Sequence, residues 1–263
     1  MGIGCVRYFD IFCKLVSTQL VIARKGLWDQ VINLYIWTSI TLVIMGYIMQ
    51  NFGLASGYGV FQFASIVAVV GLFEVYNSAT KTIMDIGGDR NISYYLTLPA
   101  KPATVLLSMA CSYGLVSMFL TAILLPFGSL VLYNRFDIAA ISWIKFIIIA
   151  LLTNAFFSLF TIAMIAHVGT ISKMRNIWMR FIWPLWFLGC YQFSWKALYV
   201  VSIPGAYLAL CNPITFVAEG MRGALLGTSA FLPWGLCCAA LCGYIMICWY
   251  YAYYKMKRLL DFV

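Results

Sequence analysis

Two groups of ionisable side chains in this sequence could do chemistry in apolar surroundings. Glu74 stands inside a long apolar run, and an ionisable residue at such depth predicts a functional contact with an ion or a substrate. The alternative is a polar partner for Asn77 or for a neighbouring helix. Glu219 and Arg222 are spaced i, i+3, so one helical face can hold them as a pair. We favour a structural ion pair here, with direct substrate contact as the alternative.

Other kinds of chemistry lack the residues they need. His167 is the one histidine, so a metal site with two His ligands is excluded, and we expect it to cap the fourth membrane span. The nine cysteines form no C-x-x-C pair and are expected to act as small apolar residues. The run Gly87-Gly88-Asp89-Arg90 lacks the Lys-Ser/Thr of a phosphate-binding loop. We therefore expect no metal, no cofactor and no ATP hydrolysis in this chain.

The elements that position these residues are predicted to be membrane-spanning helices. Hydrophobic residues make up 64% of the chain and charged residues 10%, against about 45–50% and 25% in a soluble domain. The apolar runs are continuous rather than alternating, which favours helices over barrel strands. Basic residues lie between these runs, so the net charge of +9 indicates membrane topology and not nucleic-acid binding.

Run lengths predict one all-α membrane domain over residues 1–263, with six transmembrane helices. The spans are expected at residues 31–49, 60–81, 104–133, 142–168, 177–193 and 234–254. The domain then divides into a cytoplasmic interfacial helix (1–29), the first two spans (30–82), a cytoplasmic loop (83–103), the next two spans (104–168), the fifth span (177–193), an external re-entrant segment (194–233), the sixth span (234–254) and a cytoplasmic tail (255–263).

Two segments outside the spans carry their own patterns. Residues 8–28 mix apolar side chains with Lys14, Arg24 and Lys25, which predicts an amphipathic helix in the cytoplasmic interface. A disordered basic tail is the alternative. Residues 194–233 are largely apolar but are interrupted by prolines, glycines and charges, so we expect two short helices that enter the membrane and return.

The distribution of basic residues sets the predicted orientation. Of the 17 Lys and Arg residues, thirteen fall on the side of the two termini and four on the other side. Positive charge is enriched in cytoplasmic loops. We therefore expect both termini, and the loops around Arg90 and Arg175, on the cytoplasmic side of the inner or plasma membrane.

Two local motifs add a family resemblance. One is Asn212-Pro213 followed by Glu219, Arg222 and small residues up to position 227, just before the last span. The other covers residues 92–107 of the first cytoplasmic loop and includes Leu96-x-Leu98-Pro99. Together with the spacing of six spans, these motifs make nearly the whole chain resemble the ABC-2 family of permeases, the membrane subunits of ATP-binding-cassette exporters.

This resemblance implies an exporter of an amphiphilic substrate, such as a lipid-linked glycan, a lipid or a hydrophobic drug. A separate ATPase subunit would bind ATP and magnesium, and a second permease copy or homologue would complete the transporter in the bilayer. The resemblance assigns the external re-entrant motif to Asn212, Pro213, Glu219 and Arg222. It assigns the ATPase-coupling loop to Asp89, Arg90, Ile92, Tyr94, Tyr95, Leu96, Leu98 and Pro99. An energy-independent carrier or channel, and an intramembrane enzyme, are the alternatives.

Overall fold

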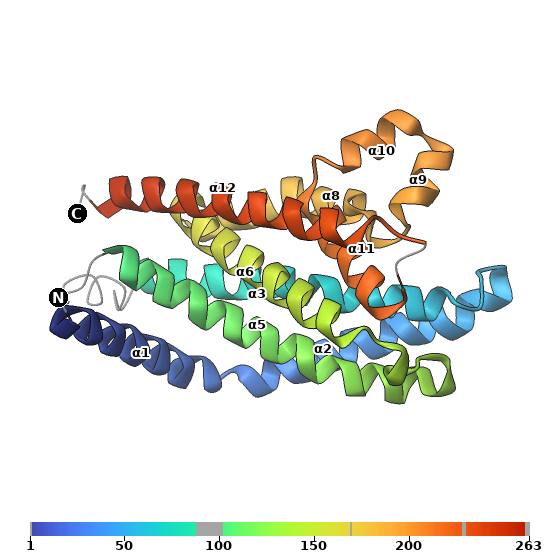
Figure 1. Ribbon diagram of the computed structural model, residues 1–263, viewed down its shortest axis with the longest axis horizontal. Helices are drawn as coiled ribbons and strands as arrows, with labels where there is room; N and C mark the ends of the chain where they lie inside the picture. The colour runs from blue at the N-terminus through green and yellow to red at the C-terminus, as the bar shows by residue number, and fades with distance from the viewer. Residues whose placement is uncertain (1, 88–101, 169, 228–229, 261–263) are drawn as a thin grey trace.

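The computed structural model describes residues 2–87, 102–168, 170–227 and 230–260, which form an elongated bundle of helices (Figure 1). These ranges contain no strand, as the continuous apolar runs predict. Within them, five helices are long and apolar enough to cross a membrane: Leu27–Phe52, Tyr58–Asp85, Ala103–Leu132, Trp143–Val168 and Trp234–Lys255. The chain is therefore a multi-pass helical membrane protein.

The chain begins with two helices that follow one another along the bundle (Figure 1). Helix α1 (Gly2–Arg24) packs along α5 (Pro102–Leu132), and the Gln19 side chain exchanges hydrogen bonds with Ser108 and Ser112 of that helix. The predicted N-terminal helix is thus present, and the alternative of a disordered tail is wrong for these residues. Helix α2 (Leu27–Val43) continues through a wider turn, η1 (Ile44–Ile48), and a tighter one, η2 (Met49–Phe52).

Helix α3 (Tyr58–Gly87) lies against α5, α6 (Trp143–Val168) and α11 (Pro213–Leu225), and most of its span is buried. Small residues allow this close packing. A Cβ atom on Gly71 of α3 would lie 2.5 Å from the Phe157 ring of α6. Glycine therefore sets the distance between these two central helices. Helix α12 (Trp234–Leu260) packs on the outer side of α6 and keeps much of its surface exposed.

The predicted fifth span is not one continuous helix. It is divided into α7 (Ile171–Ile177), η5 (Trp178–Ile182), α8 (Trp183–Trp186) and η6 (Phe187–Tyr191). Pro184 has no backbone N–H to donate, and η5 and η6 on either side are wider π-helical turns. Gly189 and Cys190 then leave helical geometry, with Cys190 at φ 57°. Helical turns thus occupy most of the predicted fifth span, with two wider stretches that the apolar run alone does not indicate.

The segment after it holds three short helices where two were predicted. These are α9 (Trp195–Val201), α10 (Ile203–Ala209) and α11. Each begins with a side-chain cap: Ser194, Ser202 and Asn212 accept hydrogen bonds from backbone N–H groups at the start of the three helices. A polar cap before each first turn favours a new helix start. Ser194 and Ser202 each start a helix, which accounts for the additional short helix in this segment.

Both termini lie at one end of the bundle (Figure 1). The last turn of α6 contacts α12 toward this end, where His167 Nδ1 and Tyr251 Oη are 2.7 Å apart. His167 thus lies in the final turn of the fourth predicted span, as expected.

Candidate functional site

The acid and base of the 212–227 motif meet on α11. Asn212 caps this helix by accepting from the Ile214 N–H at 3.0 Å, and its Nδ2 donates to the Leu185 carbonyl at 2.6 Å. Pro213 follows at the first helical position, where its fixed φ favours a helix start. Three residues apart, Glu219 Oε1 and Arg222 Nη1 are 3.1 Å apart, and both side chains have zero exposure.

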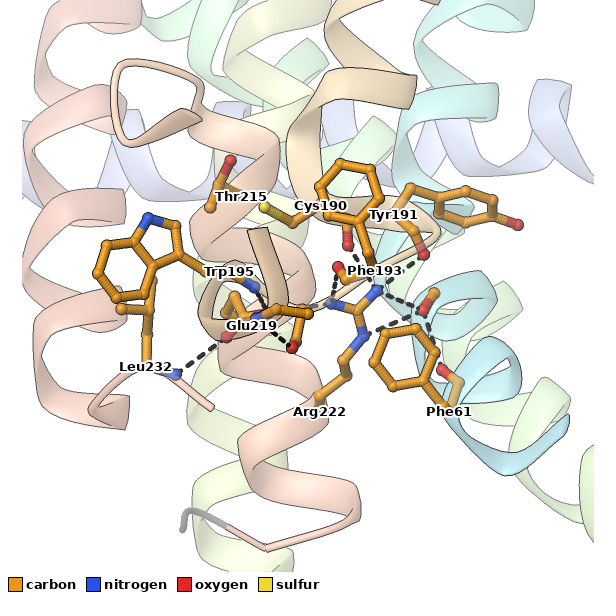
Figure 2. A network of polar contacts seen from close by, with 12 residues as sticks. Phe61, Cys190, Tyr191, Phe193, Trp195, Thr215, Glu219, Arg222 and Leu232 are labelled. Carbon is orange, nitrogen blue, oxygen red and sulfur yellow. Dashed lines mark hydrogen bonds and ion pairs between the residues drawn. The ribbon is translucent and has the colours of Figure 1, made fainter. Parts of the chain in front are cut away.

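Arg222 connects α11 to two other parts of the fold (Figure 2). Its Nε and Nη2 donate to Ser65 Oγ of α3, at 3.1 and 2.7 Å. Its Nη2 also donates to the carbonyls of Cys190 and Tyr191, at 2.6 and 2.8 Å, and its Nη1 to that of Phe193 at 3.3 Å. The interrupted end of the fifth segment therefore supplies the carbonyl oxygens that this cation binds.

One aromatic ring and two backbone N–H groups complete the surroundings of the pair. The guanidinium carbon of Arg222 lies 3.9 Å from the centroid of the Phe61 ring, a distance at which the ring attracts a cation. Glu219 Oε1 accepts from the Trp195 N–H at 3.0 Å, and its Oε2 accepts from the Leu232 N–H at 2.9 Å. The carboxylate thus holds the start of α9 and the segment before α12.

We call this set of contacts around Glu219 and Arg222 the outer clasp. Burial lowers the pKa of Arg222 to about 10, and the charge of Glu219 opposes that shift. Arg222 therefore stays protonated at neutral pH. A buried ion pair is costly to form, but removing one partner costs about 3–5 kcal/mol because the other charge stays buried. The contacts support a structural role for the pair, in which it ties five segments together.

Glu74 lies on α3, nine residues after Ser65 of the outer clasp, in the half of the helix that ends at Gly87. Its side chain is 6% exposed, and the Ser78 hydroxyl donates to its Oε1 at 2.5 Å. Among the described residues, Arg222–Glu219 is the one ion pair within 4 Å, so Glu74 has no basic partner within that distance, although Lys81 lines a cavity with it. The carboxylate lines two cavities, which makes it accessible to a small ligand.

Several predicted residues cannot be placed in this site. The coupling-loop residues Asp89, Arg90, Ile92, Tyr94, Tyr95, Leu96, Leu98 and Pro99 lie outside the described residues. Sequence reasoning also missed Ser65, whose hydroxyl receives two Arg222 donors. A single hydroxyl in an apolar span is a usable signal, because such groups bond across helices in membranes. The carbonyls of the fifth segment carry no sequence signal at all.

Compared with protein-family models and with curated proteins, the chain gives no match.

Proposed function

We propose that this chain is the membrane subunit of an ABC-2 type exporter, driven by a separate ATPase subunit. The exporter would move an amphiphilic substrate out of the cytoplasm or the inner leaflet. The observation that carries this proposal is the order of elements: an N-terminal helix, two long helices, two more, an interrupted fifth segment, three short helices and a last long helix. This order agrees with the architecture that the sequence motifs imply.

Under this proposal the chain crosses the bilayer six times. The interrupted segment Ile171–Tyr191 would be the fifth crossing, and α9 and α10 would be re-entrant helices. At 1.5 Å per residue, a segment of this length reaches roughly 30 Å, the thickness of the hydrocarbon core. Irregular backbone at membrane depth requires protein partners, and the outer clasp supplies them.

The outer clasp supports a model in which one part of the subunit is rigid and another part transmits movement. It fixes α11, the end of the fifth segment and the start of α12 to α3, so these parts would move as one body. Movement would then be transmitted from the other end of α3, whose last residues are the first residues of the predicted loop 83–103. We propose that this loop contacts the ATPase, and that α1 lies near the cytoplasmic interface.

Purification with partner identification tests the proposal directly. The tagged chain, extracted in mild detergent from its native host, should co-purify with a subunit that carries a phosphate-binding loop. The complex should hydrolyse ATP, and the isolated chain should not. Retrieval of the chain without any ATPase, together with energy-independent flux in vesicles, would favour the carrier or channel alternative instead.

A matched pair of variants tests the loop. Tyr95→Ala with Leu96→Ala removes two large apolar groups from the proposed ATPase contact, and truncating a buried interface anchor costs on the order of 2 kcal/mol or more. Co-purification of the ATPase should fall. The control is Tyr207→Ala with Leu208→Ala, the same dipeptide on α10, where both side chains are exposed. Equal ATPase recovery from both variants would refute the assignment of the loop.

A further inference from the structure

Two cavities meet at Glu74, and they differ in character. The first, of about 430 Å³, lies between α2, α3, α5 and the interrupted fifth segment. Six of its lining residues are aromatic: Trp37, Phe73, Tyr76, Trp178, Trp183 and Trp186. The second, of about 290 Å³, is lined by polar side chains that include Gln19, Ser78 and Lys81. Gln30 and Glu74 line both cavities, so they form the boundary between them.

The aromatic cavity has a defined shape, because its rings pack against one another. Phe73 meets Trp186 edge-on, with ring centroids 5.3 Å apart at 80°, and Tyr76 lies 4.9 Å from Trp178. Trp186 is 4% exposed, whereas Trp37 is 45% exposed and lies on the outer surface of α2. The cavity therefore has a buried wall and an edge that reaches the apolar surface. Its volume lies in the range of pockets that hold small organic molecules.

The boundary between the cavities holds one buried acceptor without a partner, on Gln30, and one acidic side chain, Glu74. Gln30 Oε1 is buried and has no hydrogen-bond partner among the described residues. Glu74 accepts a hydrogen bond from Ser78, and Lys81, seven residues farther along α3, lines the second cavity with it but forms no ion pair with it within 4 Å. Seven residues correspond to about 10 Å along a helix axis. A ligand that brings N–H donors and a positive charge would satisfy both residues.

We propose that this cavity binds a lipophilic organic ammonium ion. The ammonium group lies at Glu74 and Gln30 and donates N–H hydrogen bonds to their oxygens. The apolar body lies among Trp37, Phe73 and Trp186, where aromatic faces attract the cation and apolar burial adds binding energy. Entry past Trp37 would come from the apolar surface, so the ligand partitions into the membrane first.

Binding by the purified chain tests this proposal independently of ATP and of any partner subunit. Failure of the exporter proposal would leave the binding site intact, and failure of binding would leave the exporter proposal intact. The probe is rhodamine 6G, a cationic xanthene with N–H donors, measured by fluorescence anisotropy on the chain in phosphatidylcholine nanodiscs. Empty nanodiscs give the background. Fluorescein, an anionic xanthene, is the charge-reversed comparison.

We expect saturable rhodamine 6G binding above the background and none by fluorescein. Glu74→Gln should weaken binding about tenfold or more, because it removes the charge but keeps the shape. Asp29→Asn, an exposed acid on α2 outside both cavities, is the matched control and should bind as the parent does. Trp37→Leu should also weaken binding, whereas Trp143→Leu, an exposed tryptophan on α6, should not.

Phosphatidylethanolamine in the nanodiscs identifies the source of the natural ammonium group. If it competes with the dye, the ligand is an amine-bearing lipid; if it does not, the ligand is a separate lipophilic cation. The proposal is overturned if rhodamine 6G does not bind above the background, if fluorescein binds equally well, or if folded Glu74→Gln binds as the parent does. Should Glu74→Gln fail to fold, the comparison of dyes and the tryptophan variants decides the question.

Discussion

Arg222→Met is the most informative change to the outer clasp. Methionine fills much of the same space but donates none of the six hydrogen bonds that Arg222 makes. Three backbone carbonyls lose this donor, and Glu219 becomes a buried charge without its cation. Breaking a buried pair in this way costs about 3–5 kcal/mol. For a chain of this size each kcal/mol lowers the Tm by about 2–4 °C, so a fall on the order of 10 °C is expected.

A second variant separates the charge from the packing. Glu219→Gln removes the negative charge and keeps one oxygen, which can accept from only one of the backbone N–H groups of Trp195 and Leu232. When it is added to Arg222→Met, no unpaired charge stays buried, so the double variant should regain about 1–3 kcal/mol relative to Arg222→Met alone. Coupled residues give such non-additive effects.

The assay is thermal unfolding in detergent, followed by loss of the monodisperse peak in size-exclusion chromatography. Lys173→Met, an exposed basic residue on α7, serves as the control for charge and should unfold with the parent. The structural account of the clasp fails if Arg222→Met unfolds at the parent temperature. It also fails if the double variant is destabilised by the full sum of the two single changes.

Three further outcomes are expected. Gly71→Leu places side-chain atoms where a Cβ alone would lie 2.5 Å from Phe157, so the yield of monodisperse protein should fall sharply, while Gly57→Leu, with open space around its Cβ, should not reduce it. Asn212→Ala removes the cap of α11 and its contact with Leu185, and should lower the free energy of unfolding by about 1 kcal/mol, measured as a Tm shift. In a cysteine-free background, an impermeant thiol reagent applied to intact cells should label a cysteine at Gly57 and not one at Arg175; the reverse pattern would refute the proposed orientation.

Much of the bundle could be predicted from composition and run length, because lipid requires helices of a minimum length. The fourth predicted span, 142–168, agrees with α6 within one residue, since charge and turn residues mark both of its ends. The fifth, 177–193, overlaps a helical segment with wider turns on both sides of Pro184, which the sequence does not indicate because the effect of a proline depends on the neighbours that accept its irregular backbone. Local pattern thus sets where a helix can form, and tertiary contacts decide whether it stays regular.

In the candidate sites, too, the sequence predicts local contacts but not contacts between distant segments. The spacing of Glu219 and Arg222 predicted their ion pair, since three residues place two side chains on one helical face. Their other partners come from Ser65 and from carbonyls more than 25 residues away along the chain, which no local pattern indicates. Trp37, Phe73 and Trp186 likewise show the spacing of ordinary core or lipid-facing aromatics, and only the packing of their helices brings them around one cavity.

The dependence of the fifth segment on Arg222 also bears on how the protein is made. The carbonyl of Tyr191 leaves the ribosome 31 residues before the arginine that donates to it. During that interval the irregular end of the segment has no cation, and unpaired carbonyls are costly in hydrocarbon. Under the proposal that the fifth segment crosses the bilayer, its stable insertion would wait for α11, and the last third of the chain would enter the membrane as a single cooperative step rather than helix by helix.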